Sequence, residues 1–340
     1  MYTDADLDAA VASGAMTPAA AAGLRGFTAA QQAGPAADEE PLRLVTSFND
    51  VFVTIAIGLV LVAINLLMLP FALLGPPLTA AACWGLAEYF TRRRRMALPS
   101  IVLVFAFVLG VTLTAAVLAG MLTAGNQHGV GWTAGAVTCT ATVAGAIGAH
   151  LHWRRFQVPI SVAAGTLAAA ACILSAAIWA FPALLRWYAA ILLVTGLCVF
   201  AFAMWWDAGD RLRRTRRSDA AFWLHLLASP LIVHPIFLGF GLLSGVGGLS
   251  GALVAIGCYG VLAIIALTVD RRASLVSSLI YVLWATASLL SAADTLGTPL
   301  PLAALGIGTW LLVLSASWQR ARRLVLHGVP RWVRDRVPAA

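Results

Sequence analysis

Residues 92–121 read RRRRMALPSIVLVFAFVLGVTLTAAVLAGM. Four arginines stand at the start, and the rest of the stretch contains no charged residue. A helix needs about 20 mostly apolar residues to cross a bilayer. Arginine-rich segments beside such helices stay on the cytoplasmic side of the membrane. The stretch therefore predicts a membrane-spanning helix that starts in the cytoplasm.

The same pattern recurs along the whole chain of 340 residues, which is 61% hydrophobic and 11% charged. Soluble domains carry about 25% charged residues, so this composition indicates a polytopic membrane protein. We expect an all-α fold, a transmembrane helix bundle with about ten spans in five hairpins. The second span is expected to be the shortest, because Pro76 and Pro77 fall near its start. The predicted spans lie near 51–69, 74–91, 98–121, 133–151, 157–180, 183–206, 220–243, 251–269, 273–293 and 299–318.

The basic residues indicate the orientation, since all 22 of them are arginine. Arginines follow the second, fourth, sixth, eighth and tenth predicted spans, whereas the gaps after the odd spans contain none. Arg186 is the one departure from this pattern. Cytoplasmic gaps carry the excess of positive charge, so both termini are expected in the cytoplasm.

A short basic motif recurs in two of the cytoplasmic gaps. RRMALP at 94–99 returns sixty residues later as RRFQVP at 154–159. A duplicated two-helix unit would explain this period, and so would a simple run of hairpins of similar length. Both interpretations stay open.

The chain is expected to divide into a cytoplasmic helical hairpin at 1–46, the transmembrane bundle at 47–318 and a tail at 319–340. Thr17 followed by Pro18 predicts a helix start, because threonine caps helix N-termini and proline fits the first turn. The tail interleaves arginines with apolar residues. This pattern predicts a basic amphipathic helix on anionic lipid headgroups.

The opening of the chain carries a loose motif. Residues 6–18 read DLDAAVASGAMTP, in which a leucine, a glycine and a Thr-Pro pair follow one another, and an alanine-rich segment continues to Phe27. This segment and the general layout resemble a family of uncharacterised bacterial multi-pass membrane proteins that begin with a short cytoplasmic helical hairpin. The resemblance implies a location in the bacterial inner membrane and no established activity.

The formal net charge of +8 would suggest nucleic-acid binding in a soluble protein. Here the cytoplasmic arginines of a membrane protein already explain the charge, and they attract anionic lipid. We therefore expect no nucleic acid as a partner. The expected partners are the lipid bilayer and the anionic headgroups at the basic loops and tail. A homo-oligomer and a cytoplasmic protein partner for 1–46 stay open.

The cysteines give no indication of a metal or a disulfide. All five lie inside apolar segments and none forms a C-x-x-C pair. Buried free cysteines behave as small apolar packing residues. No metal site and no cofactor are predicted, and the absence of lysine excludes a Schiff base.

Three pairs of opposite charges lie four residues apart near the arginine-rich ends of spans. Side chains at this spacing meet on one face of a helix. We expect them to be neutralised pairs at the cytoplasmic interface, where His150 and His152 are expected as well. The pairs are Glu88 with Arg92, Asp207 with Arg211, and Asp210 with Arg214.

The predicted span 220–243 differs from the others because two histidines, a serine and two prolines fall inside it. Each proline removes a backbone donor, and a carbonyl freed in this way must find a neighbour, water or a cavity. These residues could line a hydrated pocket or pathway. The alternative is a proline-kinked helix whose histidines bond to neighbouring helices. The pocket or pathway candidates are His225, Ser229, Pro230, His234 and Pro235.

On the outer side, Arg186 and Asp294 carry opposite charges at a similar predicted depth. A partner would relieve the departure of this arginine from the positive-inside pattern. We therefore add Arg186 and Asp294 to the candidates and expect them to pair.

Three classes of function remain open. The first is passive or gradient-coupled movement of a small solute or ion, with 220–243 as the pathway element. The second is a membrane-embedded enzyme or redox protein that uses His225 and His234. The third is a non-transporting scaffold or sensor. The sequence leaves open whether the protein is an enzyme.

Overall fold

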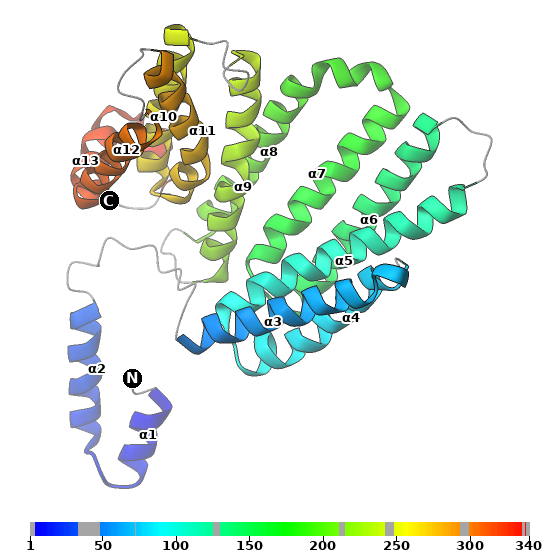
Figure 1. Ribbon diagram of the computed structural model, residues 1–340. Helices are drawn as coiled ribbons and strands as arrows, with labels where there is room; N and C mark the ends of the chain where they lie inside the picture. Colours follow the sequence, from blue (N-terminus) through cyan, green and yellow to red (C-terminus); the bar gives the residue numbers. More distant parts are fainter. Residues whose placement is uncertain are drawn as a thin grey trace. The chain divides into compact units, whose positions relative to one another are not determined.

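The computed structural model describes residues 4–32, 48–71, 73–124, 130–210, 215–241, 248–292, 299–334 and 337. Every regular element within these residues is a helix (Figure 1). The expected all-α fold is therefore confirmed for the described part of the chain. Two compact units, Met1–Pro41 and Leu42–Ala340, make up the chain.

The first unit contains two helices, α1 at Asp4–Ala12 and α2 at Pro18–Gln32. The Thr17 hydroxyl accepts a hydrogen bond of 3.2 Å from the backbone N–H three residues later. This is the contact expected of a residue that caps a helix. Arg25 of α2 lies 2.6 Å from Asp8 of α1. The predicted helical hairpin is thus present, with an exposed ion pair across it.

The second unit contains the apolar helices. Ten α-helices of its described residues, α3 to α12, follow one another in the order of the predicted spans. Their bounds, with those of the shorter elements, are α3 Phe48–Leu67, η1 Leu69–Phe71, α4 Gly75–Ala87, η2 Glu88–Arg93, α5 Ala97–Thr123, α6 Val130–Phe156, α7 Ile160–Ala180, η3 Pro182–Trp187, α8 Tyr188–Ala208, α9 Arg216–Gly239, α10 Gly248–Val269, α11 Ala273–Ala292, α12 Pro299–Ala316, α13 Trp318–Gly328 and α14 Arg331–Arg334.

Six helical stretches in the described residues are long and apolar enough to cross a membrane: α3, α5, α6, α7, η3 with α8, and α9. A seventh arises if α12 and α13, which meet at a bend of 80°, form one span. α10 and α11 contribute shorter apolar helices, at Leu253–Val269 and Ser274–Trp284. Length and composition thus give six or seven spans, fewer than the predicted ten.

α4 is shorter than its neighbours for a local reason. It has 13 residues, and its prolines stand at the first positions. Proline is well tolerated there because the N–H groups of the first turn have no partner within the helix. The prolines therefore start the helix instead of breaking it. A π-helical turn, η2, follows α4 directly.

The repeated basic motif has different backbone conformations in its two copies. In 94–99 the left-handed residue is Arg95, with a φ of 55°, and α5 begins two residues later. In 154–159 it is Gln157, and the proline of the motif stands immediately before α7. The similarity of the two sequences is therefore not matched by the local structure.

Large apolar side chains cover the outside of the second unit. The exposed fractions of Leu122, Ile173 and Leu312 are 82%, 70% and 73%. Apolar surface of this extent is unfavourable in water, whereas lipid chains are as apolar as the side chains. The exposed surface agrees with the helix lengths in indicating a membrane protein.

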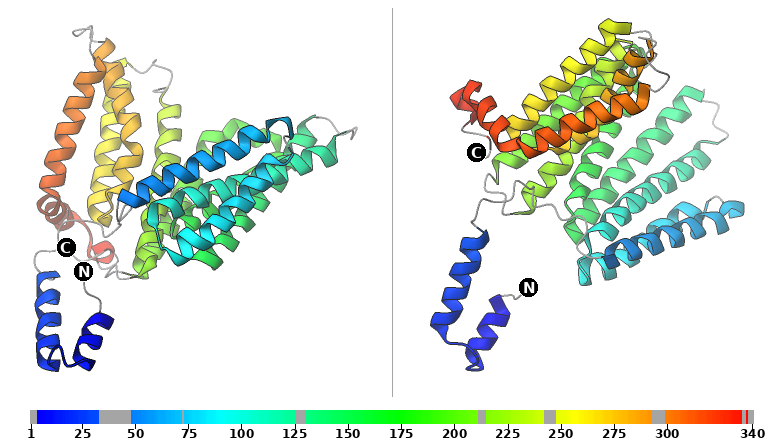
Figure 2. Two further views of the ribbon diagram at one scale, coloured as in Figure 1. Left: turned by 60° about the horizontal axis from the view of Figure 1, so that its bottom comes forward. Right: turned by 60° about the vertical axis from the view of Figure 1, so that its left-hand side comes forward.

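α9 lies between two groups of helices in the second unit (Figure 1 and Figure 2). On one side α9 packs against α7 and α8, and on the other side it packs against α11. α4, α5, α6 and α7 pack in sequence, each against the next, while α10 and α12 both pack against α11. α9 is thus the helix through which the two groups meet.

The contact between α8 and α9 is close because of Gly196. A Cβ atom at this position would lie 2.8 Å from the Leu231 carbonyl carbon and 2.8 Å from the Ile232 side chain. Glycine therefore lets the two backbones approach, as small residues do in many membrane helix pairs. α9 itself remains helical through both Pro230 and Pro235.

Candidate functional site

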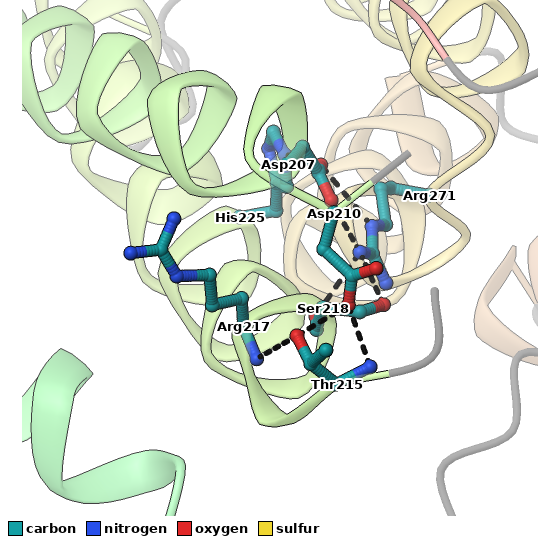
Figure 3. A network of polar contacts seen from close by, with 7 residues as sticks. All are labelled: Asp207, Asp210, Thr215, Arg217, Ser218, His225 and Arg271. Carbon is teal, nitrogen blue, oxygen red and sulfur yellow. Dashed lines mark hydrogen bonds and ion pairs between the residues drawn. The ribbon is translucent and has the colours of Figure 1, made fainter. Parts of the chain in front are cut away.

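A buried network of charged and polar side chains joins α8, α9 and the residues after α10 (Figure 3). Asp207 lies near the end of α8, His225 lies in α9, and Arg271 follows α10. One carboxylate oxygen of Asp207, Oδ2, lies 2.9 Å from His225 Nε2, and the other, Oδ1, accepts a hydrogen bond from Arg271 Nη2. The three residues are buried, with exposed fractions of 2%, 0% and 2%.

Arg271 bonds to both of the neighbouring helices. Its Nε also donates to Asp207 Oδ2 at 3.3 Å, so that guanidinium and carboxylate meet at two points. Its Nη2 donates to the backbone carbonyl and to the hydroxyl of Ser218, each at 3.0 Å. Because Ser218 lies in the first turn of α9, a single side chain holds the ends of α8, α9 and α10 together.

The backbone at the end of α10 explains why Arg271 leaves the helix here. Asp270 has a φ of 59°, in the left-handed region that ends helices and that aspartate tolerates. The Arg271 N–H donates to the Ala266 carbonyl at 2.9 Å, which is the hydrogen bond of a Schellman motif. The turn therefore satisfies the helix end while it releases the arginine from the helical path.

A second carboxylate, Asp210, fixes the start of α9. Its Oδ2 accepts hydrogen bonds from the N–H and the hydroxyl of Thr215, at 2.7 and 2.6 Å. The Thr215 hydroxyl accepts from the Arg217 N–H at 3.2 Å, as an N-cap residue does. Arg211 and Arg214, the partners predicted for Asp207 and Asp210, lie outside the residues that the structure describes.

The network can exist in two charge states. A carboxylate can only accept hydrogen bonds, so His225 Nε2 carries a proton in the contact with Asp207. With a neutral imidazole the charges of Asp207 and Arg271 cancel. A second proton on His225 would add a positive charge close to Arg271, in a cluster that also contains the carboxylates of Asp210 and Asp219. An excess charge in the interior of a protein is costly, so protonation of His225 would weaken the hold on Arg271.

The remaining candidates on α9 contact other partners. The Ser229 hydroxyl donates to the His225 carbonyl, one turn earlier, at 3.0 Å. His234 Nδ1 lies 3.3 Å from the hydroxyl of Tyr281 in α11. The two histidines thus bond to different neighbouring helices, an arrangement that the sequence left open as the alternative to a pathway.

The structure describes only one residue of the predicted pair on the outer side, Arg186. Arg186 lies in η3, and its guanidinium carbon is 5.8 Å from the centroid of the Trp187 ring. Asp294 lies outside the described residues. The contact with the tryptophan ring is a cation–π interaction at an exposed position.

Glu88 in the π-helical turn contacts Arg92 at 3.3 Å, which is the predicted pair. It also contacts Arg155 of α6 at 2.6 Å. All three side chains are partly exposed, and exposed ion pairs contribute little to stability. This cluster therefore links α6 to η2 without forming a buried site.

His152, which the sequence places near the cytoplasmic interface, lies inside the helix bundle. Its side chain is fully buried, and its Nδ1 lies 3.1 Å from the Ser161 hydroxyl of α7. The rings of Trp84 and Phe156 surround it, with centroids 6.3 and 4.5 Å away. Position near an arginine pair indicated the depth of His152 along the helix, whereas packing with α4 and α7 decides its burial.

The expected surface helix of the tail packs partly against the bundle. Trp318, at the start of α13, donates from its indole nitrogen to Asp270 Oδ1 at 2.8 Å. Arg322 is buried, and its Nε donates to the Leu267 carbonyl at 3.2 Å. Arg323 and other residues of α13 remain exposed. One face of this helix therefore covers α10, and the other face is available to solvent or lipid.

The described residues contain no group of three histidine, cysteine, aspartate or glutamate side chains that could hold a metal ion. Comparisons with known proteins give no match, since no family model, no curated protein and no solved structure is significantly similar to the chain.

Arg271 and Ser218, like Thr215 and Arg217, are members of this network that the sequence did not indicate. Arg271 looks like any other cytoplasmic arginine of a positive-inside pattern. Ser218 precedes the predicted span and has no partner at helical spacing. A buried contact between residues this far apart in the chain leaves no local signal.

Proposed function

We propose that the protein moves a small solute or ion across the bacterial inner membrane, passively or coupled to an ion gradient. In this proposal α9 is the pathway element, ten helices span the membrane, and both termini lie in the cytoplasm. The order of α3 to α12 and the alternation of arginine-bearing gaps support this topology.

The buried Asp207 carboxylate, which contacts both His225 and Arg271, is the observation that carries the proposal. Ionisable residues within membrane helices are costly and mark pathways, proton relays and switches. Histidine is the side chain whose charge changes most readily near neutral pH. A proton taken up at His225 would therefore alter a buried electrostatic contact between the two groups of helices.

The consequence for transport follows from the position of α9. Arg271 ties the start of α11 to α8 and α9, and α9 packs against helices on both sides. The second proton of His225 would lie on Nδ1, and the resulting imidazolium would repel the Arg271 guanidinium across the shared carboxylate. Weakening of the Arg271 contact would let α10 and α11 shift relative to α8. Rocking of one helix group against another around a fixed binding site is a common basis for gradient-coupled transport.

The test is ion flux into liposomes that contain the purified full-length chain. Internal dyes report the entry of H⁺, Na⁺ or K⁺ down an imposed gradient. The variants are His225→Gln and Arg271→Gln, and the control is His327→Gln, which changes an exposed histidine in α13. We expect wild type and H327Q to raise flux above that of empty liposomes, and the two network variants to lose it.

Circular dichroism and size-exclusion profiles must show that the network variants are folded before their flux is compared. Wild-type flux equal to that of empty liposomes for all three ions would reject the proposal. A folded H225Q variant with wild-type flux and unchanged pH dependence would reject the role of the network.

A further inference from the structure

A large apolar hollow lies between α6, α7 and α8. Its volume is about 660 Å³, and small side chains line it, among them Ala146 of α6 and Gly165 and Ala169 of α7. The segment 163–172 reads AAGTLAAAAC, so α7 presents little side-chain volume here. Ile173 and Val194 at the border are 70% and 58% exposed, which means that the hollow opens to the side of the bundle.

One end of the hollow is aromatic, and two arginines lie near it. Trp153 and Trp206 both line it, and their rings meet edge to face at 6.3 Å. The Arg217 guanidinium carbon lies 5.9 Å from the centroid of the Trp206 ring. Arg216 Nη1 donates to the carbonyl of Gln157, in the turn between α6 and α7, at 3.4 Å. Arg217 therefore lies beside Trp206, and Arg216 contacts the turn that follows α6, close to this end of the hollow.

Trp206 also offers an unused donor. Its indole nitrogen is buried, and it has no hydrogen-bond partner among the described residues. A buried polar group without a partner is costly, and buried tryptophan N–H groups usually find an acceptor. An ester or phosphate oxygen of a molecule bound in the hollow would supply this acceptor.

A second hollow, of about 770 Å³, continues along the same helices toward their other ends. Leu174 borders both hollows, and Trp179 borders the second. From Ser161 to Trp179, α7 rises by about 27 Å at 1.5 Å per residue, which is close to the thickness of a bilayer's hydrocarbon core. The two hollows together thus have the length that an extended acyl chain needs.

We infer that the hollow between α6, α7 and α8 binds one molecule of an anionic phospholipid. An acyl chain lies along α7 over its small residues, and the phosphate lies beside Arg216 and Arg217. The lining is too apolar to retain water. An acyl chain fills the space at little cost in free energy, because lipid already surrounds the helices. The arginines select the anionic headgroup. This site is independent of the proposed transport function.

The binding experiment uses native mass spectrometry of the purified full-length chain in detergent. Phosphatidylglycerol and phosphatidylcholine with identical acyl chains are titrated separately. We expect one phosphatidylglycerol to bind more tightly than one phosphatidylcholine. Arg217→Gln should reduce this preference about fivefold, and the double change with Arg216→Gln about 30-fold, from roughly 1 kcal/mol per arginine. The matched control is Arg323→Gln on the exposed face of α13.

A second pair of variants tests the hollow itself. Ala169→Trp places a large side chain in the hollow, whereas Ala176→Trp places the same side chain on an exposed part of α7 that lines neither hollow. We expect A169W to lose both lipids and A176W to bind as wild type does. Excess glycerol phosphate should not displace the phospholipid, because it lacks the acyl chain.

Three results would overturn the inference. Equal affinity of wild type for the two lipids would remove the role of the arginines. Wild-type binding by a folded A169W variant would show that the lipid lies elsewhere. Displacement by glycerol phosphate would show that the arginines bind a free phosphate and that the hollow takes no part.

Discussion

Asp207 and Arg271 lie 64 positions apart in the chain and form an ion pair in the protein interior, where each side chain is 2% exposed. The pair connects the end of α8 to the start of α11, and His225 shares its carboxylate. Buried ion pairs of this kind are costly to form and more costly to break from one side. Several measurable properties of the protein depend on this relationship.

Removal of one partner should destabilise the fold strongly. Asp207→Asn leaves the Arg271 guanidinium buried without its counter-ion, and Arg271→Gln does the same to the carboxylate. Each is expected to lower the free energy of unfolding by about 3–5 kcal/mol. Unfolding by SDS in mixed micelles measures this loss. The double variant should lose less than the sum of the two, whereas strict additivity would show that the two side chains do not interact.

The close contact of α8 and α9 predicts opposite effects for two glycine substitutions. Gly196→Ala places a methyl group 2.8 Å from atoms of Leu231 and Ile232, and it should cost about 1–3 kcal/mol of stability. Gly58→Ala in α3 meets no atom within 4 Å and should keep or slightly raise stability, because alanine favours helices. Equal unfolding curves for both variants would contradict the described packing.

The two histidines of α9 should differ in importance. Tyr281→Phe removes the hydroxyl that contacts His234 and should cost about 0.6 kcal/mol, the average for hydrogen bonds between membrane helices. His225→Leu should cost several times more, because Asp207 loses a buried donor. Melting temperatures in detergent compare the two variants. A larger loss for Y281F than for H225L would reverse this ranking.

Trp318 should control how firmly α13 is attached. Trp318→Phe keeps an aromatic ring and removes the indole N–H that bonds to Asp270, a loss of about 0.5–1.5 kcal/mol. We expect a cysteine introduced at the buried position Leu326 to react faster with a maleimide in this variant. A cysteine at the exposed position Leu324 serves as the reference, since its reaction rate should stay constant.

The helices could be predicted from the sequence because apolar length and composition act locally. The same holds for the contact of Glu88 with Arg92, since residues four apart meet on any helix. The contact of Arg271 with Asp207 has no such signal, because it depends on how three helix ends converge. The sequence made no prediction about the burial of His152, since a nearby arginine pair indicates depth along the membrane normal and not distance from the protein surface.

Asp270, Arg271 and Arg272 are consecutive, and their side chains contact two different regions, α13 and the ends of α8 and α9. Asp270 accepts from Trp318, Arg271 reaches α8 and α9, and the Arg272 guanidinium lies 4.9 Å from the Trp318 ring centroid. The tripeptide thus fixes the positions of α8, α9 and α13 relative to the junction between α10 and α11. Insertion of a single residue here would displace every one of these contacts together, so a change in chain length should be tolerated far less well at this junction than any one substitution.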